Sequence, residues 1–170
     1  MKSIGVISDT HGLLRPQALS ALQGSDPIIH AGDVGDPAIL KALGEIAPVL
    51  AVRGNIDRGA WAGDLPIRQV VQLEEHLIYV LHDLYELDLD PASAGFHAII
   101  FGHSHRPKIE TKDGVLYFNP GSAGPRRFDL PITVGRLMIS GGGLQAEIID
   151  LGSGSRVGKG AWRRAHLSDR

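Results

Sequence analysis

Five short apolar runs, each followed by side chains with oxygen or imidazole donor atoms, constrain this chain more than any other feature. The runs are rich in β-branched residues and cover 4–7, 27–29, 49–52, 77–81 and 98–101. The donor side chains that follow them are Asp9, His11, Asp33, Asn55, His82, His103 and His105. In open α/β sheets, ligands bind outside the carboxyl ends of the strands. We therefore expect these seven side chains to converge on one crevice.

The pattern between and after the runs predicts an α/β fold. Helical patterns occupy 16–22 and 37–46, and each begins with a proline, which suits the first helical turn. Runs that are apolar at successive positions are typical of parallel strands covered on both faces. Strand candidates separated by short turns then follow at 69–73, 77–81, 108–111, 115–118, 132–139 and 144–149. We find no repeat or linker, so we expect residues 1–150 to form a single domain in which two sheets share one core.

The segment 151–170 has a different composition. It opens with glycine and serine, carries five basic residues, and lacks apolar periodicity apart from Trp162. We predict a mobile basic C-terminal tail. The alternative is a basic arm that recruits a partner or a nucleic acid.

Composition narrows the chemistry and the partners. The chain has no cysteine, so any metal must be held by oxygen and imidazole. A formal net charge of −2 gives no electrostatic case for binding nucleic acid or a membrane surface. No apolar run approaches the roughly 20 residues of a membrane span, and run 4–7 is too short for a signal peptide. We predict a cytoplasmic protein with no membrane partner.

The spacing of the donors favours metal binding. In Asp9-x-His11 and His103-x-His105, side chains at i and i+2 point the same way if the backbone is extended, so each pair can grip a metal ion. Glycines at 32, 54 and 102 allow sharp turns and a close approach of the backbone. Seven such donors fit two divalent cations. We favour Mn²⁺, and Ni²⁺, Fe, Zn²⁺ or Mg²⁺ fit the same donors.

These motifs, Asp-x-His, Gly-Asp, Gly-Asn, His and Gly-His-x-His in that order, resemble the calcineurin-like metallophosphoesterase superfamily. The resemblance covers 1–149 and points to the small single-domain, YfcE-like phosphodiesterase branch. The run Asn119-Pro120-Gly121-Ser122, followed by Pro125-Arg126, is similar to that branch as well. The resemblance implies a sandwich of two mixed β-sheets flanked by helices.

The resemblance also implies a division of the donors between two metal ions. One ion takes Asp9, His11 and His105, the other takes Asn55, His82 and His103, and Asp33 bridges both. A bridging carboxylate holds two cations about 3.5–4 Å apart, where a shared hydroxide can attack phosphorus in line. Asp33, Asn55 and His103 are then the catalytic candidates, because Asp33 bridges the two cations while His103, Asn55 and the cations offset the developing charge. The expected activity is metal-dependent hydrolysis of a small phosphate ester.

Two positions depart from the family pattern. Many members have His directly after the Asn, whereas this chain has Ile56, which cannot donate a proton to a leaving group. We therefore expect phosphodiesters with good leaving groups to be preferred over monoesters. Asp83 follows His82, where Gly is usual, and either orients the His82 ring or is a solvated loop residue. Asp57 either supports the metal ligands through hydrogen bonds or is a plain turn residue.

Other candidates have both a functional and a structural interpretation. Arg126 and Arg53 are candidates for binding a substrate phosphate, although surface arginines near loops are common. The four histidines outside the motifs are expected to be structural or exposed: His30, His76, His97 and His166.

Two other functions compete with a small-molecule hydrolase. One is a catalytically weak protein-binding scaffold on the same fold, since the resemblance extends to the retromer-type scaffold subunit. The other is a nuclease, which the balanced charge argues against. The complete donor set favours an enzyme, and formation of a homo-oligomer stays open.

Overall fold

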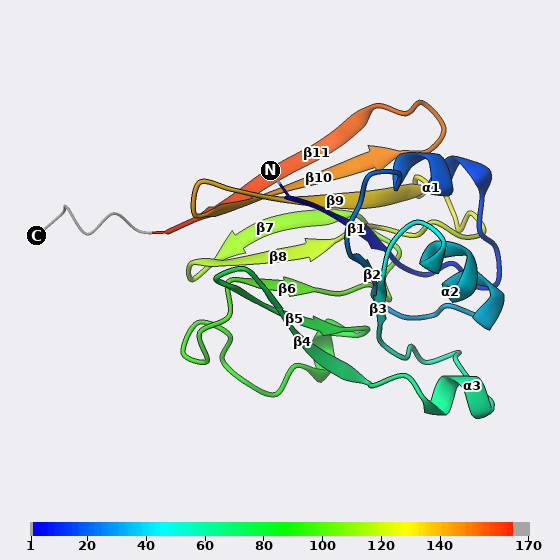
Figure 1. Cartoon of the computed structure of the whole chain (residues 1–170), viewed down its shortest axis with the longest axis horizontal. Coiled ribbons are helices and arrows are strands. Elements are labelled where there is room, and N and C mark those ends of the chain that lie inside the picture. The colour runs from blue at the N-terminus through cyan, green and yellow to red at the C-terminus, as the bar shows by residue number, and fades with distance from the viewer. Residues whose placement is uncertain (1, 165–170) are drawn as a thin grey trace, which may run out of the picture.

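Two β-sheets face each other across a shared core in the part of the chain that the computed structural model describes, residues 2–164 (Figure 1). His166, expected to be structural or exposed, lies outside the described residues. The six-stranded sheet has the order β11-β10-β9-β1-β2-β3, and the five-stranded sheet has the order β4-β5-β6-β8-β7. The predicted sandwich of two mixed sheets flanked by helices is confirmed.

The six-stranded sheet joins a parallel half to an antiparallel half. Its strands are β1 (Lys2–Ile7), β2 (Ile28–His30), β3 (Val49–Ala51), β9 (Thr133–Ser140), β10 (Gly143–Asp150) and β11 (Arg156–Arg163). β1, β2 and β3 pair in parallel, whereas β9 runs antiparallel to β1 and starts the antiparallel half. The three parallel strands therefore end at one edge of the sheet.

The five-stranded sheet has parallel strands at its centre and antiparallel strands at its edges. Its strands are β4 (Arg68–Leu73), β5 (His76–Leu81), β6 (Ala98–Ile100), β7 (Lys108–Lys112) and β8 (Val115–Asn119). β5, β6 and β8 pair in parallel, and β4 and β7 pair antiparallel at the two edges. The segment between β5 and β6, which contains the 3-10 turn η1 (Leu84–Glu86), packs Leu84, Leu87 and Phe96 against the outer face of this sheet.

β1 shows how an uninterrupted apolar run is used on both faces of a strand. Ile4 and Val6 belong to the core between the two sheets, whereas Ile7 belongs to the cluster beneath the helices. Because successive side chains of a strand point to opposite faces, a strand covered on both sides must be apolar throughout. The sequence 4–7 has this property at every position except Gly5.

The helices α1 (Pro16–Ala21) and α2 (Pro37–Gly44) pack beside β1, β2 and β3 through that second cluster, and α3 (Ala60–Gly63) follows β3 (Figure 1). Each of the first two begins at the predicted proline. α2 is also capped by Asp36, whose side chain accepts a hydrogen bond from the backbone N–H of Ala38 at 2.9 Å. None of the helices in residues 2–164 is long and apolar enough to span a membrane.

Strand β11 lies inside the segment predicted to be a mobile tail. It pairs antiparallel with β10, from Gly143 opposite Arg163 to Ile149 opposite Arg156. The apolar alternation that would have indicated a strand is broken by Gly158 and Gly160. A Cβ added to Gly160 would lie 2.1 Å from Cγ2 of Ile109 in β7, so this strand of the other sheet leaves no room for an apolar side chain there. The structure thus differs from the prediction over Arg156–Arg163.

Candidate metal centre

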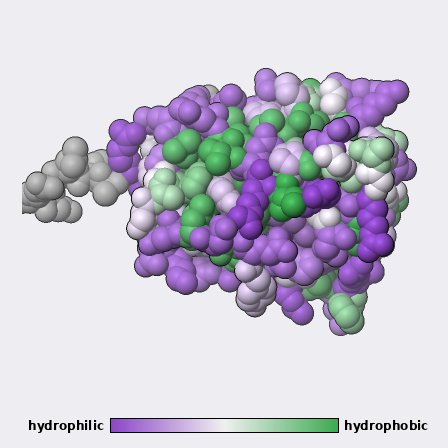
Figure 2. Space-filling model, turned by 90° about the horizontal axis from the view of Figure 1, so that it is seen from below, coloured by the Kyte–Doolittle hydropathy of each residue, from purple (hydrophilic) through white to green (hydrophobic). Residues whose placement is uncertain are grey.

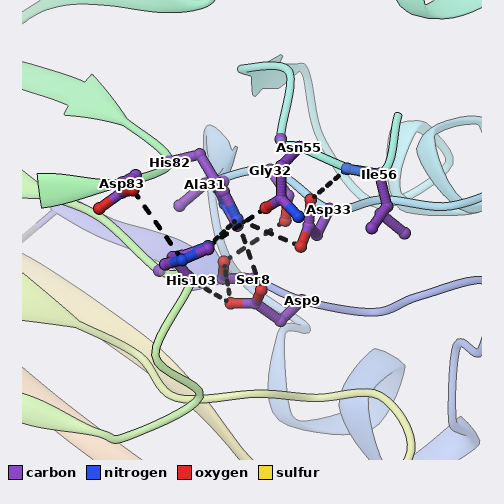
Figure 3. Close-up of polar contacts among 12 residues, drawn as sticks. Ser8, Asp9, Ala31, Gly32, Asp33, Asn55, Ile56, His82, Asp83 and His103 are labelled. Atoms are coloured by element: carbon purple, nitrogen blue, oxygen red, sulfur yellow. Dashed lines mark hydrogen bonds and ion pairs between the residues drawn. The ribbon is translucent and has the colours of Figure 1, made fainter. Parts of the chain in front are cut away.

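The seven donor side chains lie where strands of both sheets end. The strands that precede them are β1 for Asp9 and His11, β2 for Asp33, β3 for Asn55, β5 for His82, and β6 for His103 and His105. Three of these strands belong to the six-stranded sheet and two to the five-stranded sheet. The cluster therefore joins the two halves of the sandwich at its edge (Figure 3).

The backbone at the donors is not extended. Five of the seven residues have a positive φ: Asp9 (55°), His11 (46°), Asp33 (55°), His103 (70°) and His105 (62°). The sequence argument for the His-x-His pair required an extended backbone, and that assumption is wrong. His103 and His105 belong to two different groups of donors, whereas Asp9 and His11 belong to one.

The first group consists of Asp9, His11 and His105, whose donor atoms all lie within 4.8 Å of one another. Nε2 of His11 is 3.2 Å from Nε2 of His105. Oδ1 of Asp9 is 3.4 Å from Nε2 of His105 and 3.7 Å from Nε2 of His11. Metal–ligand bonds of about 2.0–2.2 Å place two ligands of one ion about 3–3.5 Å apart. The three atoms therefore have the spacing of ligands to one cation.

The second group consists of Asp33, His82 and His103. Nε2 of His82 is 3.2 Å from Oδ2 of Asp33 and 3.3 Å from Nδ1 of His103. The side chain of Asn55 joins this group, with Oδ1 3.1 Å from Nδ1 of His103. Oδ2 of Asp33 is also 3.4 Å from Nε2 of His11, so this carboxylate faces both groups. That is the place a bridging ligand would take.

Two observations test whether the residues fit cations. Oδ1 of Asp9 is buried and has no hydrogen-bond partner within residues 2–164, which is costly for a carboxylate oxygen. Asn55 lies among acceptor atoms. If the amide is turned by 180°, its nitrogen donates a hydrogen bond to Nε2 of His82 at 3.0 Å. If a cation is bound there, the amide oxygen faces the cation as a ligand. The donor set therefore fits two divalent cations held without thiolate.

The electrostatics keep the carboxylates ionised. Burial, the largest single influence, raises the pKa of Asp9, but the nearby imidazoles of His105 and His11 together with the charge of His82 outweigh it and hold that pKa below its usual range. Burial likewise raises the pKa of Asp33, and contact with His82 lowers it further than burial raises it. For His82, burial lowers the pKa and Asp33 raises it, with a net increase. Protons therefore compete with a cation for His82.

Hydrogen bonds behind the donors fix which atom faces the centre. Nδ1 of His82 donates to the carbonyl oxygen of Ala31 at 2.8 Å, which leaves Nε2 free of a proton to act as a ligand. Oδ2 of Asp9 accepts from Oγ of Ser8 at 2.8 Å and from the backbone N–H of His103 at 3.1 Å. Only Oδ1 of Asp9 then remains for a cation.

Asp57 supports the centre from behind, one of the two roles considered from the sequence. Its carboxylate accepts hydrogen bonds from the backbone N–H groups of Val34 (3.2 Å), Gly35 (2.9 Å) and Gly54 (2.9 Å). The loop that carries Asp33 is thereby tied to the loop that carries Asn55. Asp57 is buried, as this role requires.

His30 is a structural residue that braces the same region. Oγ1 of Thr10 donates to the carbonyl oxygen of Val34 at 2.8 Å, so Nε2 of His30 donates to Oγ1 at 3.0 Å. Nδ1 of His30 accepts from the backbone N–H of Gly32 at 3.1 Å, which leaves the ring neutral. Burial, the largest influence, lowers the pKa of His30 to about 4. The sequence offered no signal for this role beyond the position of His30 at the end of a run.

Two glycines are required by close approach. A Cβ on Gly54 would lie 2.1 Å from Oδ1 and 2.2 Å from the backbone nitrogen of Asp33. A Cβ on Gly102 would lie 2.1 Å from Oγ of Ser8 and 2.6 Å from Oδ2 of Asp9. Both contacts are far inside van der Waals distance, so side chains at these positions would displace the carboxylates.

A cavity of about 180 Å³ opens beside the second group of donors. Asn55, His82 and His103 line it together with Arg53, Ile67, Asp83 and Glu86. Oδ2 of Asp83 is 3.9 Å from Nε2 of His103, and Oδ1 of Asp83 accepts a hydrogen bond from the backbone N–H of Tyr85. Asp83 is therefore placed to interact with His103 and not to orient the ring of His82. Arg126 does not line this cavity but a separate one, which it shares with Arg15.

Ile56 contributes its backbone and not its side chain. Its N–H donates to Oδ1 of Asp33 at 3.0 Å. The side chain is partly exposed and points away from Asn55 and His103 (Figure 3). No imidazole therefore stands at this position to protonate a leaving group.

The sequence is similar to those of known proteins. Residues 1–142 match the sequence model of the calcineurin-like phosphoesterase superfamily domain. The chain is 36% identical over 163 residues to a probable metallophosphoesterase of Methanothermobacter thermautotrophicus, covering 88% of this chain and 93% of the relative. It is 30% identical over 161 residues to phosphodiesterase YfcE of Escherichia coli, covering 81% and 88%.

Solved structures show the same fold. The YfcE phosphoesterase of E. coli superposes with a TM-score of 0.72 at 24% identity, covering 92% of this chain and 97% of that one. Vacuolar protein sorting 29 of Cryptosporidium parvum superposes with a TM-score of 0.82 at 20% identity, covering 96% and 98%. The same fold is thus found in a phosphoesterase and in a protein named for vacuolar sorting.

Proposed function

The chain belongs to the calcineurin-like phosphoesterase superfamily, and from that membership we propose that it is a dinuclear metal-dependent phosphodiesterase for small esters with good leaving groups. The observation that carries the proposal is the complete set of seven donors, in two groups that share the carboxylate of Asp33. Two divalent cations bound there would supply Lewis acidity and lower the pKa of a water molecule. Mn²⁺ is the cation we favour, because the donors are carboxylate, amide and imidazole.

The side chains then divide the work. Asp9, His11 and His105 would hold one cation, Asn55, His82 and His103 the other, and Asp33 would fix the distance between them. Arg53 lines the adjoining cavity together with Asn55 and His103, where its guanidinium can bind a non-bridging phosphate oxygen. His103 presents its ring to the same cavity and offsets charge that develops on phosphorus.

The leaving group receives little help. The position after Asn55 is occupied by a side chain that cannot donate a proton and that points away from the centre. The carboxylates of Asp83 and Glu86 line the cavity instead, and ionised carboxylates only accept hydrogen bonds. A leaving group that departs as an anion without protonation is therefore the substrate feature we propose.

The test is hydrolysis of an aryl phosphodiester by wild type and Asp33→Asn, each reconstituted with Mn²⁺. We expect a loss of about 100-fold or more in kcat/KM, because changes behind the ligands already cost about 10–100-fold. Asp64→Asn is the control, since Asp64 is exposed and has no hydrogen bond or ion pair in the described part of the chain. Equal rates for wild type and Asp33→Asn would refute the proposal.

Counting metal ions distinguishes the enzyme from a scaffold on the same fold. Two Mn²⁺ per wild-type chain, with loss of binding in Asp33→Asn, supports the enzyme. One ion or none, together with no hydrolysis, supports the scaffold. Seen from below, the surface shows groups of apolar side chains with polar side chains between them (Figure 2).

A nuclease would need a track for a polymeric phosphate backbone. A net charge of −2 does not provide one. Cleavage of single-stranded oligonucleotides faster than of aryl diesters would favour the nuclease.

A further inference from the structure

A groove lined by arginines runs beside α1. Its smaller part is a cavity of about 110 Å³, lined by Arg15 and Arg126 among others. Its larger part is a cavity of about 560 Å³, whose lining includes Arg136 and Arg156. The two parts share Gln17, Asp150 and Leu151, so they lie side by side, and we call them together the groove. None of the residues that line it lines the cavity beside the metal centre.

The two arginines of the smaller part lack a counter-charge. Neither Arg15 nor Arg126 forms an ion pair within residues 2–164. Arg15 makes one hydrogen bond, from Nη2 to the carbonyl oxygen of Gly124 at 3.3 Å. Its Nε is buried and has no partner among the described residues. A buried charged donor without an acceptor is unusual enough to need an explanation, and an anion in the groove supplies one.

The arginines of the larger part are used by the fold. Arg136 donates to Oγ of Ser3 and to the carbonyl oxygens of Ala21 and Gln23 at the end of α1, which are neutral acceptors. Arg156 pairs with Glu147. Arg136 therefore keeps its full positive charge at the groove, whereas that of Arg156 is compensated.

The single carboxylate among the lining residues is already occupied. Oδ1 of Asp150 accepts from the backbone N–H groups of Gly152 (2.8 Å) and Ser153 (3.1 Å). Asp150 thus belongs to its own turn and pairs with none of the arginines in the described chain. The groove has a positive charge excess at Arg15, Arg126 and Arg136.

We propose that this groove binds a small phosphorylated molecule, with its phosphate on Arg15 and Arg126 and its body along Gln17 and Ser20. Guanidinium groups bind phosphate through paired, charge-assisted hydrogen bonds. A volume of about 560 Å³ lies within the usual range for small-ligand sites, of about 300–1,000 Å³. Polar side chains at Gln17 and Ser20 suit a hydroxylated body. The site is separate from the proposed active site and does not depend on the chain being a phosphodiesterase.

The experiment uses chelator-treated protein, so that phosphate cannot bind to cations at the metal centre. Inorganic phosphate and glycerol 3-phosphate are titrated into it by calorimetry at constant ionic strength. We expect one saturable site per chain, with glycerol 3-phosphate bound more tightly. Arg126→Gln weakens binding about tenfold or more, since a charge-assisted hydrogen bond is lost, and Arg15→Gln does the same.

Arg127→Gln is the matched control, because Arg127 is exposed like its neighbour Arg126 but lines neither part of the groove. It binds as wild type does if the proposal is correct. Arg126 makes no hydrogen bond in the described chain, so Arg126→Gln tests the site even if Arg15→Gln is unstable. Three results would overturn the proposal: no saturable binding to wild type, equal affinities of Arg126→Gln and Arg127→Gln, or weakening by Arg53→Gln in place of Arg126→Gln.

Discussion

Asp57→Ala is expected to destabilise the fold and the metal centre together, since three backbone N–H groups from two loops lose one acceptor. Val34 N–H and Gly54 N–H are buried, and Gly35 N–H reaches solvent. Each buried donor left without a partner costs about 1–3 kcal/mol, so the two together cost about 4 kcal/mol. With an m value of about 2 kcal/mol/M, the urea midpoint falls by about 2 M.

Asp57→Asn removes the negative charge of the side chain and keeps its shape. An amide keeps one acceptor oxygen, which can serve Val34 and Gly54, but its NH₂ then faces the N–H of Gly35. We expect about half of the loss seen for alanine, about 2 kcal/mol. Cation affinity falls in both variants by about 10–100-fold, because the loops that carry Asp33 and Asn55 are no longer tied.

Urea unfolding of the metal-free proteins measures the first effect, and Mn²⁺ titration measures the second. Asp64→Ala serves as the exposed control and stays within about 0.5 kcal/mol of wild type. A loss below about 1 kcal/mol for Asp57→Ala, with unchanged Mn²⁺ affinity, would show that the three hydrogen bonds do not hold the loops.

Three further predictions follow from other parts of the structure. Burial lowers the pKa of His30 from the ordinary 6.5 to about 4, so the unfolded chain binds a proton more readily than the folded chain, and stability falls by up to roughly 3 kcal/mol as the pH drops through this range. Urea unfolding of the metal-free proteins at pH 7 and pH 4.5 should therefore show a smaller loss of stability at the lower pH for His30→Gln than for wild type. An equal loss of stability contradicts the assignment. With no proton donor after Asn55, a p-nitrophenyl diester is hydrolysed about 100-fold or more faster than a phenyl diester; a ratio below about ten would reveal a donor. The ring centroid of Trp162 in β11 lies 4.4 Å from that of His97 and 5.4 Å from that of His76, which it meets edge-on. Trp162→Ala therefore costs about 2 kcal/mol of stability, somewhat less than for a fully buried tryptophan, while Val157→Ala at an exposed position of the same strand costs little. Equal urea midpoints for the two variants would show that β11 adds no stability.

The parts of the site that the sequence predicted are those set by local order along the chain. Each donor follows its strand within a few residues, so the end of an apolar run locates it. Convergence then follows from the parallel pairing of β1 with β2, of β2 with β3, and of β5 with β6. The sequence also shows that Ile56 cannot protonate a leaving group, because Ile56 is adjacent to Asn55 in the chain and its position is set by the same local order.

The parts that the sequence did not predict depend on backbone conformation or on distant contacts. The backbone has a positive φ at His103 and His105, which belong to different groups of donors, and no residue type at these positions predicts that conformation. The partners of Asp57 are backbone N–H groups, which every residue but proline has. Arg126 is a candidate for binding the substrate phosphate from its place in the sequence, whereas the fold places it in the groove beside α1.

The left-handed backbone at five donor positions has a consequence for how this chain can evolve. Residues other than glycine in this conformation cost of the order of 1–3 kcal/mol each, against a total stability of about 5–15 kcal/mol for a typical domain. Substitution of His11 or His105 by glycine would relieve local strain and remove a donor in one step. A descendant released from hydrolysis would therefore tend to gain stability as it lost its metal ligands, and the same framework would be left available for other work.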